Sequence, residues 1–429
     1  MNAIAPLAAQ LKARFRSGSG RAVLWSFAAA VAARLGHLVL AVLLARQLGP
    51  TSYGTFTFAT GIAMLAGQMS SLGWPILMNR LMPGLLKDRN WSRLKGLRNA
   101  GDAVVIISSL VVAAFLYGLG TALSELENGF KLAALLTVPL ALTLLRRQQL
   151  AAMGRAAIGL MFDQGFGAIV LVIIILLWGA VTVEAAIVQY ACATGIGIVI
   201  TTILFRRGLP RELASVRPSY ELRVWAAMAL PMIIGQSAKL LMHKIDILML
   251  APLSDLHEVG LYGAAFRVTY LLSFPQVVLM SVFTPLFSQA FTNRNIKGVR
   301  RILKWSLLFA CVTTVPAAAA ILLVPELVMG GVFGPEFREA APTLAVLTVA
   351  QLAGTIAIPY SAVLMMGGRE RAFGAWNFGA LGANILLCFL LIPAYGALGA
   401  AYATLVSALF LMIGQILLSR PLLSLPRQA

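Results

Sequence analysis

Runs of about 20 apolar residues recur along the whole chain and are separated by short polar segments. A helix of that length spans the hydrocarbon core of a bilayer, so the pattern predicts an all-α polytopic membrane protein. The composition agrees, because 60% of the 429 residues are hydrophobic, only 11% are charged and the mean hydropathy is +0.87. A soluble protein of this size could not bury so much apolar surface.

The apolar runs predict about 12 transmembrane helices. They cover approximately residues 22–45, 53–74, 102–122, 132–150, 160–181, 184–205, 224–250, 259–287, 302–324, 340–366 and a pair within 372–419. The last stretch contains no charged residue, and as one helix it would be about 72 Å long, more than twice the hydrocarbon thickness. We therefore expect a hairpin at 392–399, where the sequence reads IPAYGALG.

The polar segment 206–223 is the longest between apolar runs and predicts the boundary between two halves. We expect a six-helix bundle over 22–205 and a second over 224–419, with tails at 1–21 and 420–429. With the N-terminus in the cytoplasm, the cytoplasmic segments hold 27 Lys and Arg residues and the opposite side holds three. This bias predicts that both termini are cytoplasmic, and it explains the net charge of +19 without a nucleic-acid partner.

An internal repeat relates the first helix of each half. The segment LGHLVLAVLLARQLGPTSYG follows Arg34, and LLMHKIDILMLAPLSDLHEVG follows Lys239. Arg34 lies 20 residues before Gly54, and Lys239 lies 21 residues before Gly260. Two halves with the same orientation are related by an axis along the membrane normal and enclose a cavity between them.

Ionisable side chains at membrane depth are costly and often functional. By helical spacing, Arg34 and His37 share one face of their helix. Lys239, His243 and Asp246 likewise share one face of theirs. We predict a cationic central cavity that suits phosphate or pyrophosphate. Its candidate residues are Arg34, His37, Lys239, His243 and Arg267, and the candidates for ion or proton coupling are Asp246 and His243.

A structural role is the alternative for each of these residues. Lys244 and Asp246 could form a local charge pair, Arg267 could snorkel from a helix end, and the histidines could be packing residues. The three cysteines lie in apolar runs without a metal-ligand spacing. The sequence predicts no catalytic residue, metal or cofactor, and it contains no P-loop for ATP hydrolysis. An ion or proton gradient, the membrane potential or substrate consumption would then drive transport.

Four stretches resemble the polysaccharide-biosynthesis flippases (Wzx-like) of the MOP exporter superfamily. They are LARQLGPTSYGTFTFA (44–59), DILMLAPLSDLHEVGLYGAAFR (246–267), VFGPEFREAAPTLAVL (332–347) and LIPAYGALGAAYATLVSALF (391–410). The resemblance implies a two-bundle, MATE-like transporter in the bacterial inner membrane. It implies that undecaprenyl-pyrophosphate-linked oligosaccharide, or a related exopolysaccharide precursor, moves from the cytoplasmic to the outer leaflet. Membrane lipid, a polysaccharide polymerase and glycosyltransferases would be the partners.

Two other functions remain open at this point. A multidrug or cation antiporter of the same superfamily would require buried carboxylates, for which the sequence offers Asp246, Asp163 and Asp102. A membrane polysaccharide ligase or polymerase would require catalytic groups on large outer loops. The predicted outer loops are short, which disfavours the enzyme.

Overall fold

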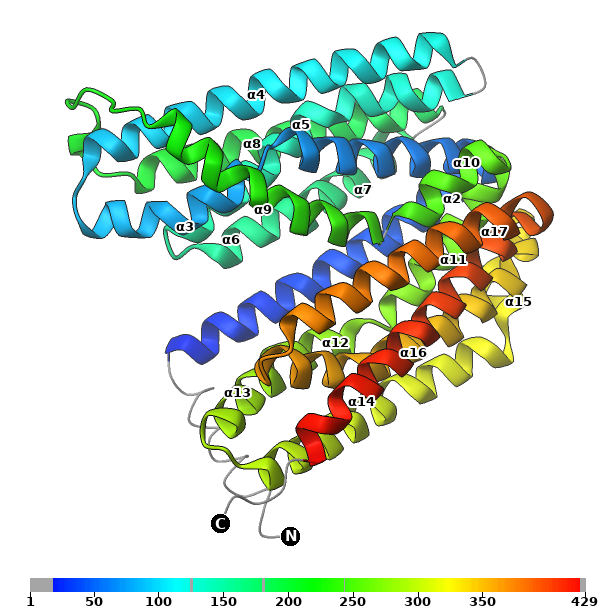
Figure 1. Ribbon diagram of the computed structural model, residues 1–429. Coiled ribbons are helices and arrows are strands. Elements are labelled where there is room, and N and C mark those ends of the chain that lie inside the picture. Colours follow the sequence, from blue (N-terminus) through cyan, green and yellow to red (C-terminus); the bar gives the residue numbers. More distant parts are fainter. Residues whose placement is uncertain (1–17, 124–125, 180–181, 243, 425–429) are drawn as a thin grey trace. The chain divides into compact units, whose positions relative to one another are not determined.

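The computed structural model describes residues 18–123, 126–179, 182–242 and 244–424, and every regular element within these ranges is a helix (Figure 1). Among the described residues, seven helical stretches are long and apolar enough to cross a membrane, by length and composition. They are Trp91–Ala122, Glu127–Ala152, Ala156–Trp178, Val183–Gly208, Ile296–Leu323, Pro335–Met366 and Glu370–Ser424. The predicted all-α polytopic membrane protein is confirmed.

The chain forms two compact units. The N-terminal unit comprises Met1–Leu40 and Ala59–Leu241, and the C-terminal unit comprises Ala41–Phe58 and Met242–Ala429. Helix α2 (Gly18–Ser70) contributes to both, and it is bent at Gly49, which has φ 73° and ψ 172°. Glycine adopts this conformation at low cost. The two arms of α2 correspond to the first two predicted helices. The predicted division into bundles at residues 206–223 stays a prediction.

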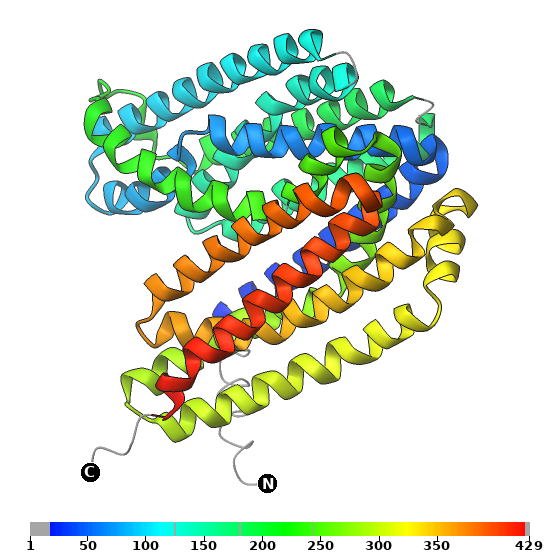
Figure 2. The same ribbon diagram turned by 45° about the vertical axis from the view of Figure 1, so that its right-hand side comes forward.

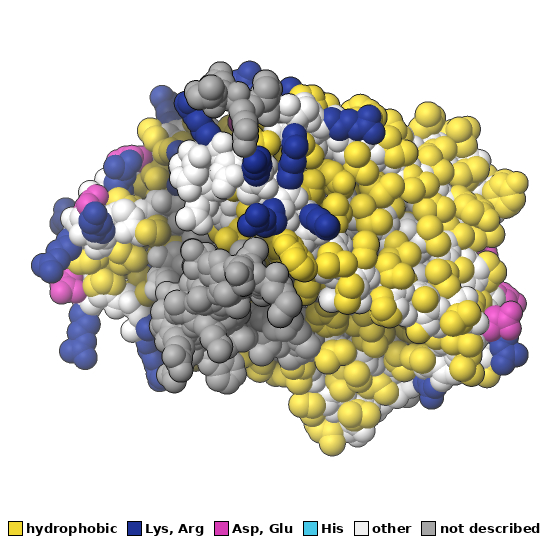
Figure 3. All heavy atoms as spheres, turned by 90° about the horizontal axis from the view of Figure 1, so that it is seen from below, with side chains coloured by type: hydrophobic (Ala, Val, Ile, Leu, Met, Phe, Trp, Pro, Cys, Tyr) yellow, Lys and Arg dark blue, Asp and Glu magenta, His cyan; other side chains and the backbone are white. Residues whose placement is uncertain are grey.

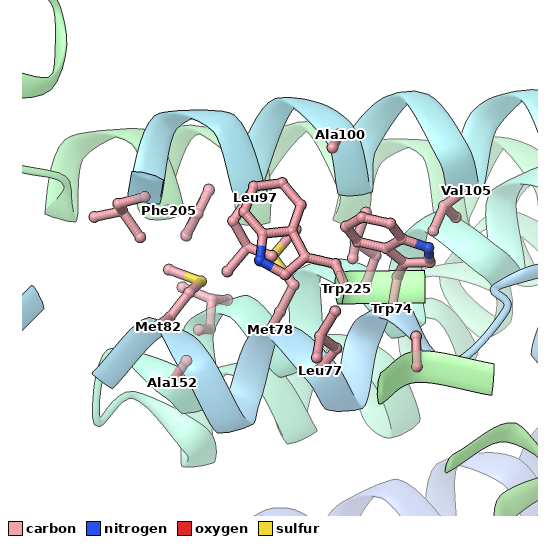
Figure 4. Packing of buried hydrophobic residues seen from close by; sticks show 14 of the residues in the cluster. Trp74, Leu77, Met78, Met82, Leu97, Ala100, Val105, Ala152, Phe205 and Trp225 are labelled. Atoms are coloured by element: carbon pink, nitrogen blue, oxygen red, sulfur yellow. The ribbon is translucent and has the colours of Figure 1, made fainter. Parts of the chain in front are cut away.

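The N-terminal unit is built around α5, which packs against α3, α4 and α8. Its elements after α2 are α3 (Trp74–Lys87), α4 (Trp91–Ala122), α5 (Glu127–Ala152), α6 (Ala156–Leu160), the π-helix η2 (Met161–Phe166), α7 (Gly167–Trp178), α8 (Val183–Gly208), η3 (Arg211–Leu213) and α9 (Leu222–Met242). In the core, Trp74 of α3 meets Trp225 of α9 edge to face, with ring centroids 6.1 Å apart (Figure 4). Met78 and Leu97 belong to the same buried cluster.

The C-terminal unit is built around α16, which packs against α11, α14 and α17 (Figure 2). Its elements are α10 (Ile245–Leu253), α11 (Leu256–Leu271), α12 (Phe274–Val278), η4 (Leu279–Phe283), α13 (Thr284–Thr292), α14 (Ile296–Leu323), α15 (Pro325–Val328), η5 (Met329–Phe333), η6 (Pro335–Ala340), α16 (Ala341–Met366) and α17 (Glu370–Ser424). Helix α17 bends at Gly396, with φ 53° and ψ −130°. The bend confirms the hairpin predicted at 392–399.

Three predicted elements differ from the structure in detail. The helix expected over 224–250 is divided, because α9 ends at Met242 and α10 begins at Ile245. The helix expected over 259–287 consists of α11, α12, η4 and α13. Pro275 and Pro285 stand in the first turns of α12 and α13, where a missing N–H is tolerated. The segment after Val324, expected as a loop, forms α15, η5 and η6.

Residues 41–58 pack closely against the rest of the C-terminal unit. A Cβ added at Gly54 would collide with the carbonyl oxygen of Leu256, and one added at Gly260 would collide with that of Pro50. The two glycines matched by the internal repeat therefore lie where the backbones of α2 and α11 approach each other closely. The ring of Tyr53 also meets that of Phe337 at 6.1 Å, and Arg46 Nε donates to the carbonyl oxygen of Val332 at 2.7 Å.

Much of the hydrophobic side-chain surface is exposed on the helices. Trp178, Leu323 and Phe389 are examples from α7, α14 and α17. On the face drawn in Figure 3, hydrophobic side chains form a broad yellow area. An exposed apolar surface of this extent fits contact with lipid rather than with water.

Candidate functional site

Among the described residues, the most buried carboxylate belongs to Asp246, in the first turn of α10, and it is 5% exposed. Its Oδ2 accepts hydrogen bonds from Tyr262 Oη at 2.9 Å and from Thr404 Oγ1 at 3.1 Å. The Cys388 thiol donates to Oδ1 at 3.5 Å. Tyr262 lies on α11, whereas Cys388 and Thr404 lie on the two arms of α17, so three helical segments converge on one carboxyl group.

All of the hydrogen-bond donors described around Asp246 are neutral. The ion pairs formed by the described residues do not include Asp246, so the predicted alternative of a local pair with Lys244 is absent among them. A buried carboxylate without a counter-charge is expensive. Taking up a proton or a monovalent cation would remove that cost, which is the chemistry that ion or proton coupling requires. No group of three or more His, Cys, Asp or Glu suited to a metal ion occurs in the described part of the chain.

A cationic cluster lies in the same unit. Arg267 of α11 is half-buried and interacts with the hydroxyl group of the buried Tyr53. Lys244, which immediately precedes α10, lies close enough to Arg267 for their charges to repel. Neither residue takes part in the ion pairs of the described chain. The guanidinium group of Arg267, with a second basic residue near it, would be stabilised by an anion such as a phosphate group.

Arg34 and His37 belong to the N-terminal unit, where both are half-buried on α2. His37 lines a small cavity together with Asp163, Tyr190 and Thr194. Asp163 lies in the π-helix η2 and forms an ion pair with Arg147, with Nη1 and Oδ2 2.8 Å apart. Single turns of π-helix occur often at functional sites. His37 therefore borders a small cavity whose lining includes one partner of an ion pair.

The role of the five predicted cavity residues stays a prediction. The side chain of Lys239 and the whole of His243 lie outside the described residues. Arg34 and His37 belong to one unit and Arg267 to the other, so their convergence on a single cavity stays a prediction. Five residues of these two clusters are not among the predicted site residues, namely Lys244, Tyr53, Tyr262, Cys388 and Thr404. Of these, only Lys244 carried a sequence signal, namely its charge within an apolar run.

Comparisons with known proteins identify the family. A model of the family described as "Polysaccharide biosynthesis protein" matches residues 19–291, which is more than half of the chain. The chain belongs to this family. A second family model, MatE, matches residues 231–390 and so includes Asp246 and Arg267.

Two curated archaeal proteins are similar to parts of this family member. It is 26% identical over 164 residues to the "Probable low-salt glycan biosynthesis flippase Agl15" of Haloferax volcanii, covering 38% of this chain and 34% of the relative. It is 23% identical over 254 residues to the uncharacterized membrane protein MJ1068 of Methanocaldococcus jannaschii, covering 57% of this chain and 45% of that relative. The matches thus span less than half of each relative's length.

Solved structures of two transporters share the fold of this polysaccharide biosynthesis family member. The lipid II flippase MurJ in an inward closed conformation matches with a TM-score of 0.68 at 15% identity, over 93% of this chain and 87% of MurJ. An inward-facing MATE family multidrug resistance transporter of the MOP superfamily matches with a TM-score of 0.69 at 15% identity, over 91% and 94%. The expected MATE- and MOP-like fold is confirmed.

Proposed function

We propose that this family member is a transporter that flips a polyprenyl-pyrophosphate-linked oligosaccharide from the cytoplasmic to the outer leaflet by alternating access. Family membership and the partial similarity to a protein named as a glycan biosynthesis flippase support this function. The observation that carries the substrate class is the half-buried guanidinium group of Arg267 on α11, which interacts with the hydroxyl group of Tyr53 and takes part in none of the ion pairs of the described residues. The protein is proposed to act in the bacterial inner membrane, with both termini cytoplasmic, and to catalyse no covalent step.

In this proposal the pyrophosphate binds to cations while the polyprenyl tail stays in the bilayer. Arg34, His37, Lys239, His243 and Arg267 would line the cavity. Arg would bind phosphate oxygens by forked hydrogen bonds, and Lys would act as a point charge. Glycosyltransferases would supply the lipid-linked sugar, and a polysaccharide polymerase would consume it.

Asp246 is proposed to couple the transport step to a proton or cation gradient. It lies two residues after Lys244 and at the start of α10, next to the break that separates α10 from α9. Uptake of a proton or a cation would neutralise the Asp246 carboxylate where α10 begins. This change in charge is proposed to alter the affinity of the cavity for the substrate.

The experiment is lipid analysis of a strain that lacks the gene, complemented with the wild type or with variants. We expect the deletion strain to accumulate a polyprenyl-pyrophosphate oligosaccharide in the cytoplasmic leaflet and to lose a surface polysaccharide. Arg34→Ala, Lys239→Ala and Arg267→Ala should fail to restore export although the protein is present in the membrane. Arg217→Ala, which removes an exposed cation from the polar connector, serves as the matched control and should restore export.

A cation antiporter is the second candidate, and the buried carboxyl of Asp246 and the MatE match favour it. The same strain separates the two functions. Unchanged lipid-linked sugars together with greater sensitivity to cationic drugs would reject the flippase and support the antiporter. Normal export by the Arg34, Lys239 and Arg267 variants would reject the cationic cavity.

A further inference from the structure

A second polar cavity lies within the N-terminal unit, among α4, α5 and α8. Its volume is about 190 Å³. Water occupies about 30 Å³ per molecule in the liquid, so the cavity has room for a group of the size of a phosphate. The residues that line it are Arg98, Asn99, Asp102, Arg146, Phe205 and Arg206.

One side of the cavity is held in place by Arg146, which is 8% exposed. Its Nη1 donates to Asp102 Oδ1 at 2.8 Å and to Gln149 Oε1 at 2.6 Å, and its Nε donates to Thr202 Oγ1 at 3.0 Å. Its guanidinium group also lies over the ring of Phe205, 5.9 Å from the centroid. The bonds join α4, α5 and α8, so the cavity wall is rigid in the way that a preformed binding site requires.

The cavity has an excess of positive charge. The carboxylate of Asp102 compensates the positive charge of Arg146. Arg98 donates from Nε and Nη2 to the neutral Asn99 Oδ1, at 3.1 and 2.7 Å. Arg206 is exposed, and neither it nor Arg98 takes part in the ion pairs of the described residues. Two guanidinium groups therefore remain available for an anion, and their forked geometry fits phosphate oxygens.

The surface beside the cavity is suited to acyl chains. Arg206 stands in the last turn of α8. Ile203 and Val199 precede it by three and seven residues, so they lie on the same face of the helix, and both are exposed. These three residues form a row along α8, with the cation Arg206 at the end of the helix and the apolar Ile203 and Val199 toward its middle. A free phosphate ion would use only the first part of this row, whereas a phospholipid would use all of it.

We propose that this cavity binds the phosphate group of an anionic phospholipid, in the leaflet that the basic loops predict to be cytoplasmic. Arg98 and Arg206 contact the phosphate oxygens, Arg146 holds the cavity wall, and an acyl chain lies along Ile203 and Val199. Basic pockets between transmembrane helices on the cytoplasmic side are suited to such head groups. The site is distinct from the proposed substrate cavity, because none of the residues that line it is a predicted substrate contact.

The test measures lipid binding to the purified full-length protein in neutral detergent at 0.15 M salt, a strength chosen to screen exposed charges. Phosphatidylglycerol, phosphatidylcholine and inorganic phosphate are each titrated, and binding is followed by native mass spectrometry and by the shift in unfolding temperature. The variants are Arg98→Gln and Arg206→Gln. Arg207→Gln is the matched control, because it removes the same charge from the same turn of α8 but from a residue that does not line the cavity.

We expect phosphatidylglycerol to bind more tightly than phosphatidylcholine. A basic residue near an anionic head group contributes about 1 kcal/mol to the free energy of binding. Arg98→Gln and Arg206→Gln should therefore each weaken phosphatidylglycerol binding at least about fivefold. The affinity of Arg207→Gln for phosphatidylglycerol should remain within about twofold of that of the wild type. Arg206→Lys keeps the charge and should lose less affinity than Arg206→Gln. The unfolding temperature without lipid shows whether each variant is folded before it is compared.

Three results would overturn the proposal in whole or in part. Equal affinity of all variants for phosphatidylglycerol would reject the cavity as its site. Equal binding of phosphatidylcholine, unaffected by the substitutions, would reject recognition of an anion. Inorganic phosphate binding that depends on Arg98 and Arg206, without binding of phosphatidylglycerol, would support the phosphate chemistry and reject the lipid as its source.

Discussion

Arg146 in the N-terminal unit and Asp246 in the C-terminal unit are buried to nearly the same extent, at 8% and 5% exposure. Arg146 has an opposite charge, Asp102, at 2.8 Å, together with neutral partners. Asp246 has hydroxyl and thiol partners. A buried charge with its counter-charge holds helices together and resists any change of ionisation. A buried carboxyl with neutral partners can change its ionisation, which makes it the better candidate for a transport step.

The largest expected effect on stability comes from breaking the ion pair between Asp102 and Arg146. Asp102→Ala leaves the Arg146 guanidinium buried without a counter-charge, which costs about 3–5 kcal/mol for a fully buried pair. Because the Asp102 side chain is 26% exposed, we expect the free energy of unfolding to fall by about 3 kcal/mol, the low end of that range. Thermal unfolding of the purified protein measures it.

The double variant Asp102→Ala/Arg146→Met is the control for this prediction. It removes both charges and should recover much of the lost stability, because an apolar pair of similar volume often replaces a buried ion pair without loss. If Asp102→Ala unfolds at the same temperature as the wild type, Arg146 is not held by its counter-charge and the contrast with Asp246 fails.

The next effect concerns transport. Asp246→Asn keeps the shape and a hydrogen-bond acceptor but removes the group that can ionise. We expect export in the complemented deletion strain to fall about 5- to 150-fold, the range that corresponds to a coupling free energy of 1–3 kcal/mol. The free energy of unfolding should change by less than about 1 kcal/mol, since a neutral partner set accepts an amide.

Asp88→Asn makes the same chemical change at the exposed C-cap of α3 and should leave export unchanged. Membrane abundance of each variant, measured by immunoblot, separates lost transport from lost protein. Full export by Asp246→Asn would make Asp246 a structural residue like Arg146.

The smallest expected effect comes from the hydroxyl group of Tyr262. Tyr262→Phe removes one hydrogen bond to Asp246 and keeps the stacking of the ring on Phe266. A hydrogen bond of this kind contributes about 1 kcal/mol, so export should fall by about fivefold, which is the lower limit of the range expected for Asp246→Asn. Tyr402→Phe is the control, since Tyr402 is exposed on α17. A Tyr262→Phe defect as severe as that of Asp246→Asn would mean that the hydroxyl itself takes part in coupling.

The long apolar helices were predictable because a helix that spans a bilayer must be apolar over about 20 residues. The surroundings of Asp246 were not, because Tyr262, Cys388 and Thr404 reach it from other helical segments, and spacing along one helix reveals only which residues share a face. Lys244 showed in the sequence only as a charge within an apolar run, so its interaction with Arg267 of another helix could not be predicted from spacing along one helix.

The segment 41–58 has a consequence for biogenesis. It belongs to the C-terminal unit, yet the ribosome synthesises it long before Met242, where the rest of that unit begins. At about 5–20 residues per second, the intervening chain takes on the order of 10–40 s to make. During that time the surface around Gly54 that α11 will cover has no partner from its own unit. The nascent chain must therefore insert its second helix early and keep one face of it available until α11 emerges.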